Sequence, residues 1–344
     1  MDPKQFDSYR RSINLYKNIL LKTREKILEQ SPSYLQPLPT NNLPNKNKMA
    51  VIIDPRYDDL MEAVILNFMH FMVPEGWVFT IASAEQYKEQ IMQRFPQTLF
   101  MQIDNSLIYY DENKIPNISI DNYNKLLCSS EFWNMIPCNQ IAIFQKDCIM
   151  YRMIPEDWIY KYDYSGAFWY TDETSLANGV INGGFSIRNK TAMLNCIKHI
   201  TWDMIEVYRK NVYTCHEFLP VEKRNEDMFF TYACEILKYQ LPPISIRKQL
   251  AIESEYFLGT CVFHGWTKVG YQIEELAIQI LSTSPLFSRY VPEILAFKSK
   301  IQQTPQLQIS NNYINPETTD KTALPIFIMQ DKSIPEVPIV SITP

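Results

Sequence analysis

Short, almost uninterrupted apolar runs alternate with amphipathic segments in the first half of the chain, and this alternation predicts strands and helices in turn. The runs that are typical of buried strands lie at residues 49–53, 77–82, 99–103, 107–110 and 140–144. Apolar residues recur at helical spacing over residues 60–72, 84–95 and 122–133. Because strands and helices alternate, we expect an α/β fold whose mostly parallel sheet carries helices on both faces.

Helices are expected to predominate after residue 169. A long helix is predicted over 189–213 and a second over 225–237, with further helices at 271–281 and 290–302. From residue 304 onward the chain is polar and rich in proline. We therefore expect an extended tail that lies across its own domain or across a partner.

Residues 4–30 predict a separate N-terminal helix. Its apolar side chains fall at alternating steps of three and four residues, with the polar Thr23 in the series, and they are Phe6, Tyr9, Ile13, Tyr16, Leu20 and Ile27. Such a stripe either packs on its own domain or forms a homodimer, and the sequence leaves both open. The proline-rich residues 31–48 predict a linker.

Composition narrows the classes of function. The net charge is −5 without a basic stripe, which argues against a protein that binds duplex nucleic acid. The seven cysteines include no C-x-x-C pair and predict free thiols in a reducing compartment. The N-terminus lacks the apolar core of a signal peptide, and no apolar run is long enough to span a membrane. We expect a soluble cytoplasmic protein that is not secreted, in the host cytoplasm if a virus encodes it.

Five short polar or glycine-bearing segments interrupt the apolar, aromatic sequence between residues 145 and 266. They are 145–147, 163–169, 182–186, 226–227 and 264–266. Seven of the eight glycines in the chain lie between Gly166 and Gly270. Since glycine is used where the backbone approaches another group closely or needs a positive φ, this concentration predicts a polar pocket.

Two of these segments offer metal ligands. Asp147 directly follows a predicted strand, which would place its carboxylate at a sheet edge, where divalent cations are often bound. His264 could supply a second ligand for Mn²⁺ or Mg²⁺, with a diphosphate completing the coordination shell. The alternatives are a solvated aspartate at a strand end and a core histidine packed between aromatic neighbours.

Glu226 and Asp227 offer a general base for sugar transfer to a hydroxyl group. Only one of two adjacent helical acids can face a pocket, and we favour Asp227; both acids would also suit the positive end of a helix dipole. The pair Gly183 and Gly184 after Asn182 would admit a ligand to the backbone or form a tight turn.

Arg188 could bind a phosphate or cap the helix that follows it. The chain contains no Walker loop, G-x-G-x-x-G, H-E-x-x-H or G-x-S-x-G motif, which disfavours kinases, nicotinamide dehydrogenases, zincin proteases and α/β-hydrolases.

Taken in order, eight segments carry a resemblance to a known family: 52–56, 121–127, 132–133, 144–147, 162–169, 182–188, 226–230 and the stretch from 251 to 264. The chain resembles a family of poorly characterised glycosyltransferase-like domains found in bacteria, fungi and large DNA viruses. The resemblance covers roughly residues 48–268. Lys146 stands where the family often has Thr or Ser, Phe168 where it usually has Pro, and Gln145 at the first acidic position of its D-x-D motif.

This resemblance implies a GT-A-type fold, with a Rossmann-like half for a nucleoside diphosphate sugar and a second half for the acceptor. It implies that Asp147 is the metal-binding aspartate and that His264 is a late metal or phosphate ligand. The implied donor-binding residues are Asp54, Arg56, Gln145, Lys146, Asp147, Asn182, Gly183, Gly184 and Arg188. Asp227, beside Glu226, would be the base of an inverting transfer.

The expected organisation is an N-terminal helix and linker over 1–47, a GT-A-like glycosyltransferase domain over 48–270, and C-terminal helices with an extended tail over 271–344. The leading hypothesis is a glycosyltransferase that uses a UDP-sugar and a glycan or protein acceptor. A non-catalytic nucleotide-sugar or glycan-binding module is the alternative that Gln145 and Lys146 favour. A third hypothesis is an assembly protein that forms a homodimer through its N-terminal helix or its tail.

Overall fold

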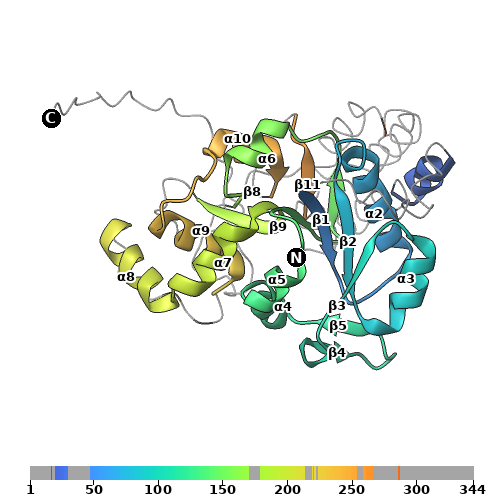
Figure 1. Cartoon of the computed structure of the whole chain (residues 1–344), viewed down its shortest axis with the longest axis horizontal. Helices are drawn as coiled ribbons and strands as arrows, with labels where there is room; N and C mark the ends of the chain where they lie inside the picture. The colour runs from blue at the N-terminus through green and yellow to red at the C-terminus, as the bar shows by residue number, and fades with distance from the viewer. Residues whose placement is uncertain are drawn as a thin grey trace, which may run out of the picture. The chain divides into compact units, whose positions relative to one another are not determined.

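A six-stranded sheet organises the computed structural model, in the strand order β3-β2-β1-β6-β9-β8 (Figure 1). Its strands are β1 (Lys48–Ile53), β2 (Val78–Ser83), β3 (Leu99–Gln102), β6 (Gln140–Phe144), β8 (Tyr164–Trp169) and β9 (Val180–Asn189). The four strands from β3 to β6 are parallel, whereas β9 runs antiparallel to both β6 and β8. This arrangement confirms the predicted α/β class with a mostly parallel central sheet.

The structure describes residues 17, 20–29, 47–169, 179–213, 219, 221, 224–253, 259–265 and 286. The chain divides into two units, Met1–Ser299 and Lys300–Pro344, and all described residues belong to the first. The predicted helices at 271–281 and 290–302, the tail after residue 304 and nearly all of the predicted linker lie outside the described residues. The domain boundaries at 47 and 270 stay predictions.

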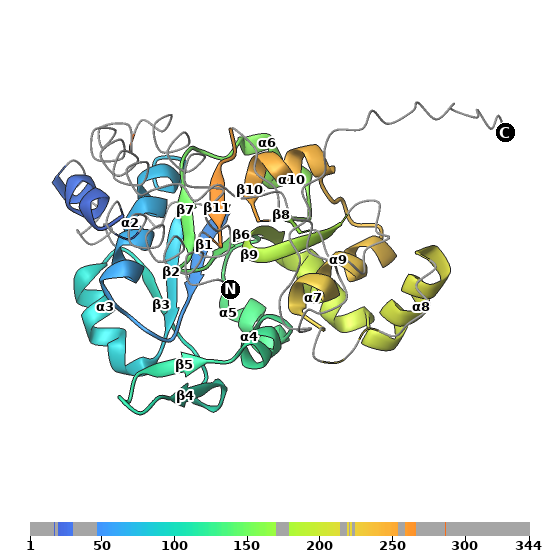
Figure 2. The same cartoon turned by 180° about the vertical axis from the view of Figure 1, so that it is seen from behind.

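Helices cover both faces of the sheet. They are α2 (Asp59–Met72), α3 (Lys88–Arg94), α4 (Ile120–Leu127), α5 (Ser130–Met135), α6 (Glu156–Lys161), α7 (Lys190–His199), α8 (Trp202–Val212), α9 (Glu226–Ile236) and α10 (Ile244–Leu250). Ala50 and Ile52 of β1 join one core cluster, with Phe68 of α2, while Val51 and Ile53 join the other. Both faces of β1 are therefore buried, as successive side chains of a strand point to opposite faces. In both views α7, α8 and α9 lie on the β9 side of the sheet (Figures 1 and 2).

Two small sheets complete the described structure. One has the order β10-β11-β7, formed by β7 (Cys148–Met150), β10 (Ala251–Ile252) and β11 (Val262–His264). The other pairs β4 (Ile108–Tyr110) with β5 (Pro116–Ile118). The described chain also contains the short 3-10 helices η2 (Glu85–Tyr87) and η3 (Asn105–Leu107). Of the helices in the described ranges, none is long and apolar enough to cross a membrane.

The described part of the N-terminal helix, residues 20–29, packs on its own domain. Leu20, Thr23 and Ile27 are buried, and the two apolar residues belong to the same core cluster as α2. Arg24 adds an ion pair with Asp59 at the start of α2, with Nη1 3.1 Å from Oδ1. The apolar positions from Phe6 to Tyr16 lie outside the described residues.

Two predicted helices are in fact pairs of helices. The prediction over 189–213 is wrong at Ile200 and Thr201, where α7 ends and the Thr201 side chain accepts a hydrogen bond from Met204 N to begin α8. The predicted helix over 122–133 is likewise divided at Ser129, between α4 and α5, where the Ser129 hydroxyl accepts a hydrogen bond from Phe132 N at 3.2 Å. A hydroxyl cap begins a new helix without interrupting the apolar spacing, so the spacing alone did not reveal the break.

Candidate functional site

Residues from four of the five polar segments predicted from the sequence meet at one edge of the central sheet, whereas Asp163 of the fifth accepts a hydrogen bond from Gln240 N at 2.9 Å, away from this edge. Strands β1 and β6 pair in parallel, so Asp54 after β1 and Gln145 after β6 leave the sheet at the same end. Strand β9 runs back past β6, and Gln145 N donates to Gly184 O at 2.9 Å. The glycine pair of β9 therefore lies directly beside the first residue of the Gln145–Lys146–Asp147 segment.

His264 reaches this edge from the small sheet. Its strand, β11, pairs antiparallel with β7, which places His264 opposite Cys148 and beside Asp147. The imidazole Nε2 lies 3.6 Å from Asp147 Oδ1 and 3.3 Å from Gln145 Oε1, and Gly265 N donates to Asp147 O at 3.1 Å. The structure thus brings together the two predicted metal ligands, which are far apart in the sequence.

Asp147 and His264 fit a divalent cation. With Cys148 they form a group whose candidate ligand atoms all lie within 4.8 Å of one another. His264 Nδ1 contacts the Glu253 carboxylate, which favours the tautomer with the proton on Nδ1 and directs Nε2 toward Asp147. The Cys148 thiol donates to Gly184 O at 3.3 Å, and a soft thiol is a poorer ligand for Mn²⁺ than a carboxylate or an imidazole.

We predict that Glu253→Gln lowers Mn²⁺ affinity by about 10- to 100-fold, because a neutral amide holds and polarises the imidazole less strongly than a carboxylate. Calorimetric titration with Mn²⁺ measures the effect. Glu235→Gln is the matched control, since Glu235 is also a partly buried carboxylate with a hydrogen-bond partner, Tyr213, but lies on α9 away from His264. Equal Mn²⁺ affinity in wild type and Glu253→Gln would contradict the role given to Glu253.

Gly184 is required where it packs against the imidazole. A Cβ atom built on Gly184 would collide with the ring of His264, including Nε2. The bulge that carries this glycine arises between β8 and β9, where Gly166 pairs with Ser186 but Ala167 pairs with Asn182. Glycine is therefore needed here for close packing, and the alternative of a tight turn is wrong, because residues 182–184 lie within a strand.

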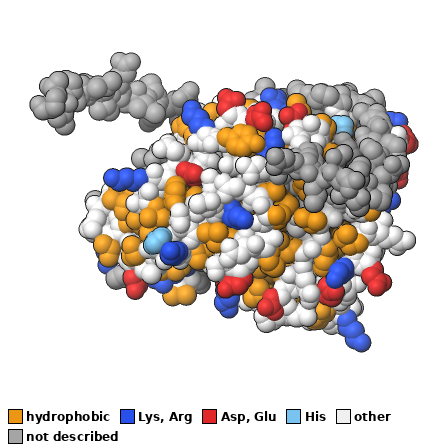
Figure 3. Space-filling view, in the orientation of Figure 1, with side chains coloured by type: hydrophobic (Ala, Val, Ile, Leu, Met, Phe, Trp, Pro, Cys, Tyr) orange, Lys and Arg blue, Asp and Glu red, His pale blue; other side chains and the backbone are white. Residues whose placement is uncertain are grey.

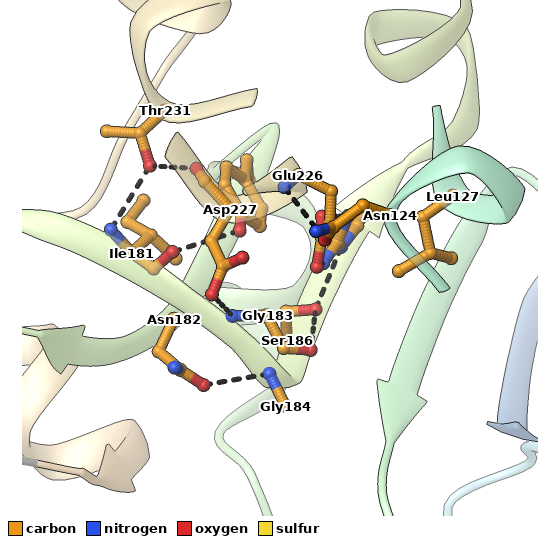
Figure 4. Close-up of polar contacts among 12 residues, drawn as sticks. Asn124, Leu127, Ile181, Asn182, Gly183, Gly184, Ser186, Glu226, Asp227 and Thr231 are labelled. Carbon is orange, nitrogen blue, oxygen red and sulfur yellow. Dashed lines mark hydrogen bonds and ion pairs between the residues drawn. The ribbon is translucent and has the colours of Figure 1, made fainter. Parts of the chain in front are cut away.

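Asp227 lies on the other side of the same bulge. Its Oδ2 accepts a hydrogen bond from Gly183 N at 3.2 Å, while Gly184 N donates to Asn182 Oδ1 at 2.8 Å (Figure 4). Thr231 Oγ1 donates to Asp227 O and accepts from Ile181 N, which ties the first turn of α9 to β9. Burial, reinforced by the neighbouring charge of Glu226, raises the pKa of Asp227 to about 7.

Glu226 and Arg188 lie behind this bulge, where they pair with each other. The Arg188 guanidinium donates to both carboxylate oxygens of Glu226, and both side chains are buried. Arg188 does not cap the helix that follows it, since Asn189 fills that place, where its Oδ1 accepts from Ala192 N at 3.2 Å.

Two cationic side chains, Arg56 and Lys146, follow the ends of β1 and β6. Asp54 accepts three hydrogen bonds from Arg56, one from its backbone N and two from its guanidinium, and these bonds raise the pKa of Arg56. Lys146 pairs with Asp58, whose other carboxylate oxygen caps α2 through Met61 N. Each cation is thus held by a carboxylate of the β1–α2 connection. Over the face shown in Figure 3, acidic and basic side chains are interspersed.

Several site residues were not predicted. Glu253 stood in a segment quoted for the resemblance, without a role, and Asp58 carried a recognisable N-cap signal before an apolar helix. Asn124 Oδ1 accepts from Glu226 N at 3.1 Å and so joins α4 to α9. The hydroxyl of Tyr123, also on α4, is buried near Gln145. Nothing in the local sequence indicated these long-range contacts.

Comparisons with known proteins found one family model and a set of solved structures that are similar to the chain. Residues 106–270 match the model of a family described as a protein of unknown function, DUF5672. No curated protein matches the chain. Among solved structures, it is similar to the galactosyltransferase LgtC in complex with donor and acceptor sugar analogues, with 8% identity, a TM-score of 0.42, and coverage of 75% of this chain and 98% of that one.

Two further solved structures are similar. The apo form of the glycosyltransferase GlyE from Streptococcus pneumoniae TIGR4 is 12% identical with a TM-score of 0.38, over 74% of this chain and 64% of that one. Mouse xyloside xylosyltransferase 1 is 9% identical with a TM-score of 0.40, over 63% of this chain and 97% of that one. All three are described as glycosyltransferases.

Proposed function

We propose that this protein is a glycosyltransferase that moves a sugar from a UDP-sugar to a hydroxyl group of a glycan or protein. One observation carries the proposal: neighbouring glycines of β9 contact the two chemical centres that such a transfer needs. Gly184 packs against His264, which faces Asp147, while Gly183 donates to Asp227. A pair of cation ligands and a carboxylate base therefore lie beside two adjacent glycines, whose lack of side chains lets the protein pack closely and brings the two centres near each other.

The cation that Asp147 and His264 would hold, Mn²⁺ or Mg²⁺, would supply Lewis-acid stabilisation to the diphosphate leaving group. Lys146 and Arg56, which pair with Asp58 and Asp54, lie at the ends of β6 and β1, where a donor diphosphate and nucleoside would bind as competing partners for these cations. The backbone of Gly183 and Gly184, with the amide of Asn182 beside it, would line the transferred sugar.

Asp227 takes the proton in this proposal. As the acceptor oxygen forms its bond to the anomeric carbon, the bond from that carbon to the diphosphate oxygen breaks, UDP leaves, and the acceptor proton passes to the Asp227 carboxylate. A carboxylate whose pKa is about 7 is a stronger base than an ordinary aspartate and is still largely ionised above neutral pH. A base on the acceptor side fits an inverting transfer.

A donor titration tests this function. We expect UDP and at least one UDP-sugar to raise the melting temperature more with Mn²⁺ than without it, since a ligand at 100 times its Kd adds about 2.7 kcal/mol of stability. Asp147→Ala should remove the Mn²⁺-dependent part, whereas Asp104→Ala, an exposed aspartate beyond β3, should leave it intact. The absence of any shift with every nucleotide tested would overturn the proposal.

A non-catalytic module of the same fold is the second candidate. The observation that favours it is Gln145, a neutral side chain next to His264 Nε2, in a segment where Lys146 is paired with Asp58. One measurement distinguishes a glycosyltransferase from a binding module, namely the release of UDP from the donor over time. Binding without release in the presence of Mn²⁺ and a panel of acceptors would favour the module.

A further inference from the structure

A fully buried ion pair lies behind Gly183, between β9 and α9. Arg188 Nη1 and Nη2 donate to Glu226 Oε2 and Oε1 at 2.8 and 3.0 Å, and the two side chains are 0% and 2% exposed. Three aromatic rings surround the guanidinium, with centroids 5.9, 4.8 and 5.3 Å from Cζ, and they belong to Trp133, Tyr164 and Phe230. Neither charged group has exposed surface on which a donor could bind.

The ion pair is connected to the glycine bulge through direct contacts. Arg188 Nε donates to Ser186 Oγ at 2.8 Å, and that hydroxyl donates to Gly183 O at 3.3 Å. A Cβ atom on Gly183 would collide with Glu226 Oε1 and Arg188 Nη2, so the glycine rests directly against the ion pair. The N–H of the same glycine donates to Asp227 Oδ2.

We propose that Arg188 and Glu226 are positioning residues, which hold Gly183 and Asp227 in place for proton transfer without contacting the donor. The inference rests on the proposed function, because it gives the pair a role in that reaction. It departs from the sequence hypotheses in which Arg188 binds the donor and Glu226 shares the role of base.

The pair also sets the charge around the base. Glu226 disfavours the ionised form of Asp227, and Arg188 opposes it with a smaller effect. Of the described residues, Tyr123, Cys128 and Tyr164 also interact electrostatically with Asp227, and they stay neutral because burial raises their pKa values. Removal of the Glu226 charge should therefore make Asp227 easier to ionise.

Glu226→Gln tests the inference, because it keeps the shape of the side chain and removes its charge. We expect the acid limb of the pH profile of kcat/KM to move to lower pH by about half a unit or more, and kcat to fall about 10-fold. The KM for the UDP-sugar should stay within about 2-fold of wild type, since no contact with the donor is lost.

A second variant separates these effects from unfolding. Glu226→Gln leaves a buried guanidinium without its counter-charge, which destabilises a fold strongly. The double variant Arg188→Met with Glu226→Gln has no charge in the pair, and we expect it to melt at a higher temperature than the single variant. Its pH profile should also be displaced to lower pH, because Glu226 affects Asp227 more than Arg188 does.

The pair Arg209–Glu206 on α8 supplies the matched control. It is also buried, with Nη1 2.9 Å from Oε2, and it lies outside the site. Glu206→Gln and the double variant Arg209→Met with Glu206→Gln should lose stability without any displacement of the pH profile.

Two results would overturn the inference while the proposed function stands. A raised KM for the donor with unchanged kcat would mean that the pair binds the donor, and an unmoved pH profile in both pair variants would reduce it to a structural role. Failure of the wild type to turn over any UDP-sugar would instead overturn the proposed function, and with it the role given to the pair.

Discussion

Asp227→Asn is expected to abolish sugar transfer and, at the same time, to stabilise the protein at pH 8. Transfer should fall by about 10²- to 10⁴-fold, the usual contribution of a general base, because an amide cannot accept the acceptor proton. The hydrogen bond from Gly183 N can persist, since the asparagine carbonyl oxygen also accepts. Measurement of kcat/KM with a UDP-sugar, together with the melting temperature, checks both effects.

The gain in stability follows from the direction of the pKa shift. The pKa of Asp227 in the fold, about 7, lies above its ordinary value of 3.8, so ionisation of this carboxylate costs folding free energy. The cost is absent below about pH 4, grows as the pH rises, and is complete above about pH 7. The asparagine variant avoids it and should gain on the order of 1–3 kcal/mol at pH 8, with the difference vanishing near pH 4.

Asp58→Asn is a control for which the expected change in stability has the opposite sign to that of Asp227→Asn. Burial alone would raise the pKa of Asp58, but hydrogen bonds from Lys146 and from Met61 N outweigh it and lower the pKa. Asp58 therefore stabilises the fold above its ordinary pKa, and this contribution is lost as the pH falls through the lowered value. If Asp227→Asn melts below wild type at pH 8, the carboxylate is held by stabilising contacts and is not a strained base.

Gly184→Ala should remove Mn²⁺-dependent binding of UDP and destabilise the fold. The added methyl group would occupy the place of the His264 ring, so either the imidazole turns away from Asp147 or β9 moves. Overpacking of this kind typically costs about 1–3 kcal/mol, and loss of one of two protein ligands should weaken Mn²⁺ binding by more than about 10-fold. Melting curves and Mn²⁺ titrations measure the two effects separately.

The double variant Gly184→Ala with His264→Ala separates the collision from the ligand. Removal of the ring relieves the steric conflict, so the double variant should be more stable than Gly184→Ala alone, although Mn²⁺ dependence stays lost. If Gly184→Ala retained the Mn²⁺ dependence of wild type, His264 would not be a ligand in the proposed place.

The sequence predicted the parallel part of the fold because local signals decide it. The apolar runs that became β1, β2 and β6 and the periodic segment that became α2 are each recognisable in isolation. Strand β9 was not predicted, since it contains Asn182, Ser186 and Arg188 beside two glycines, a composition that indicates a turn. Arg188 is buried because a distant segment supplies Glu226 of α9 as its partner, whereas Asn182 and Ser186 form their hydrogen bonds within β9.

Several residues of the candidate site were named from the sequence, but their arrangement was not predicted. The proximity of Asp147 and His264 was a hypothesis from residue types and resemblance, and it depends on the antiparallel pairing of β7 with β11, which no local pattern indicated. The environments of the two adjacent acids also depend on tertiary contacts. Glu226 pairs with a buried guanidinium, whereas the Asp227 carboxylate accepts a hydrogen bond from a backbone N–H. Adjacent positions on a helix point in different directions, but only the packed strand decides which acid is neutralised.

The bulge in β9 makes the segment that holds Gly183 and Gly184 intolerant of length changes. Most surface connections accept an inserted or deleted residue. Here one extra residue between Gly183 and Gly184 would turn one of them to the opposite face of the strand, because side-chain direction alternates along a strand. The contacts with Asp227 and with His264 would then not both form. Homologous sequences that keep this chemistry should therefore vary in the length of their loops and never in the length of this segment.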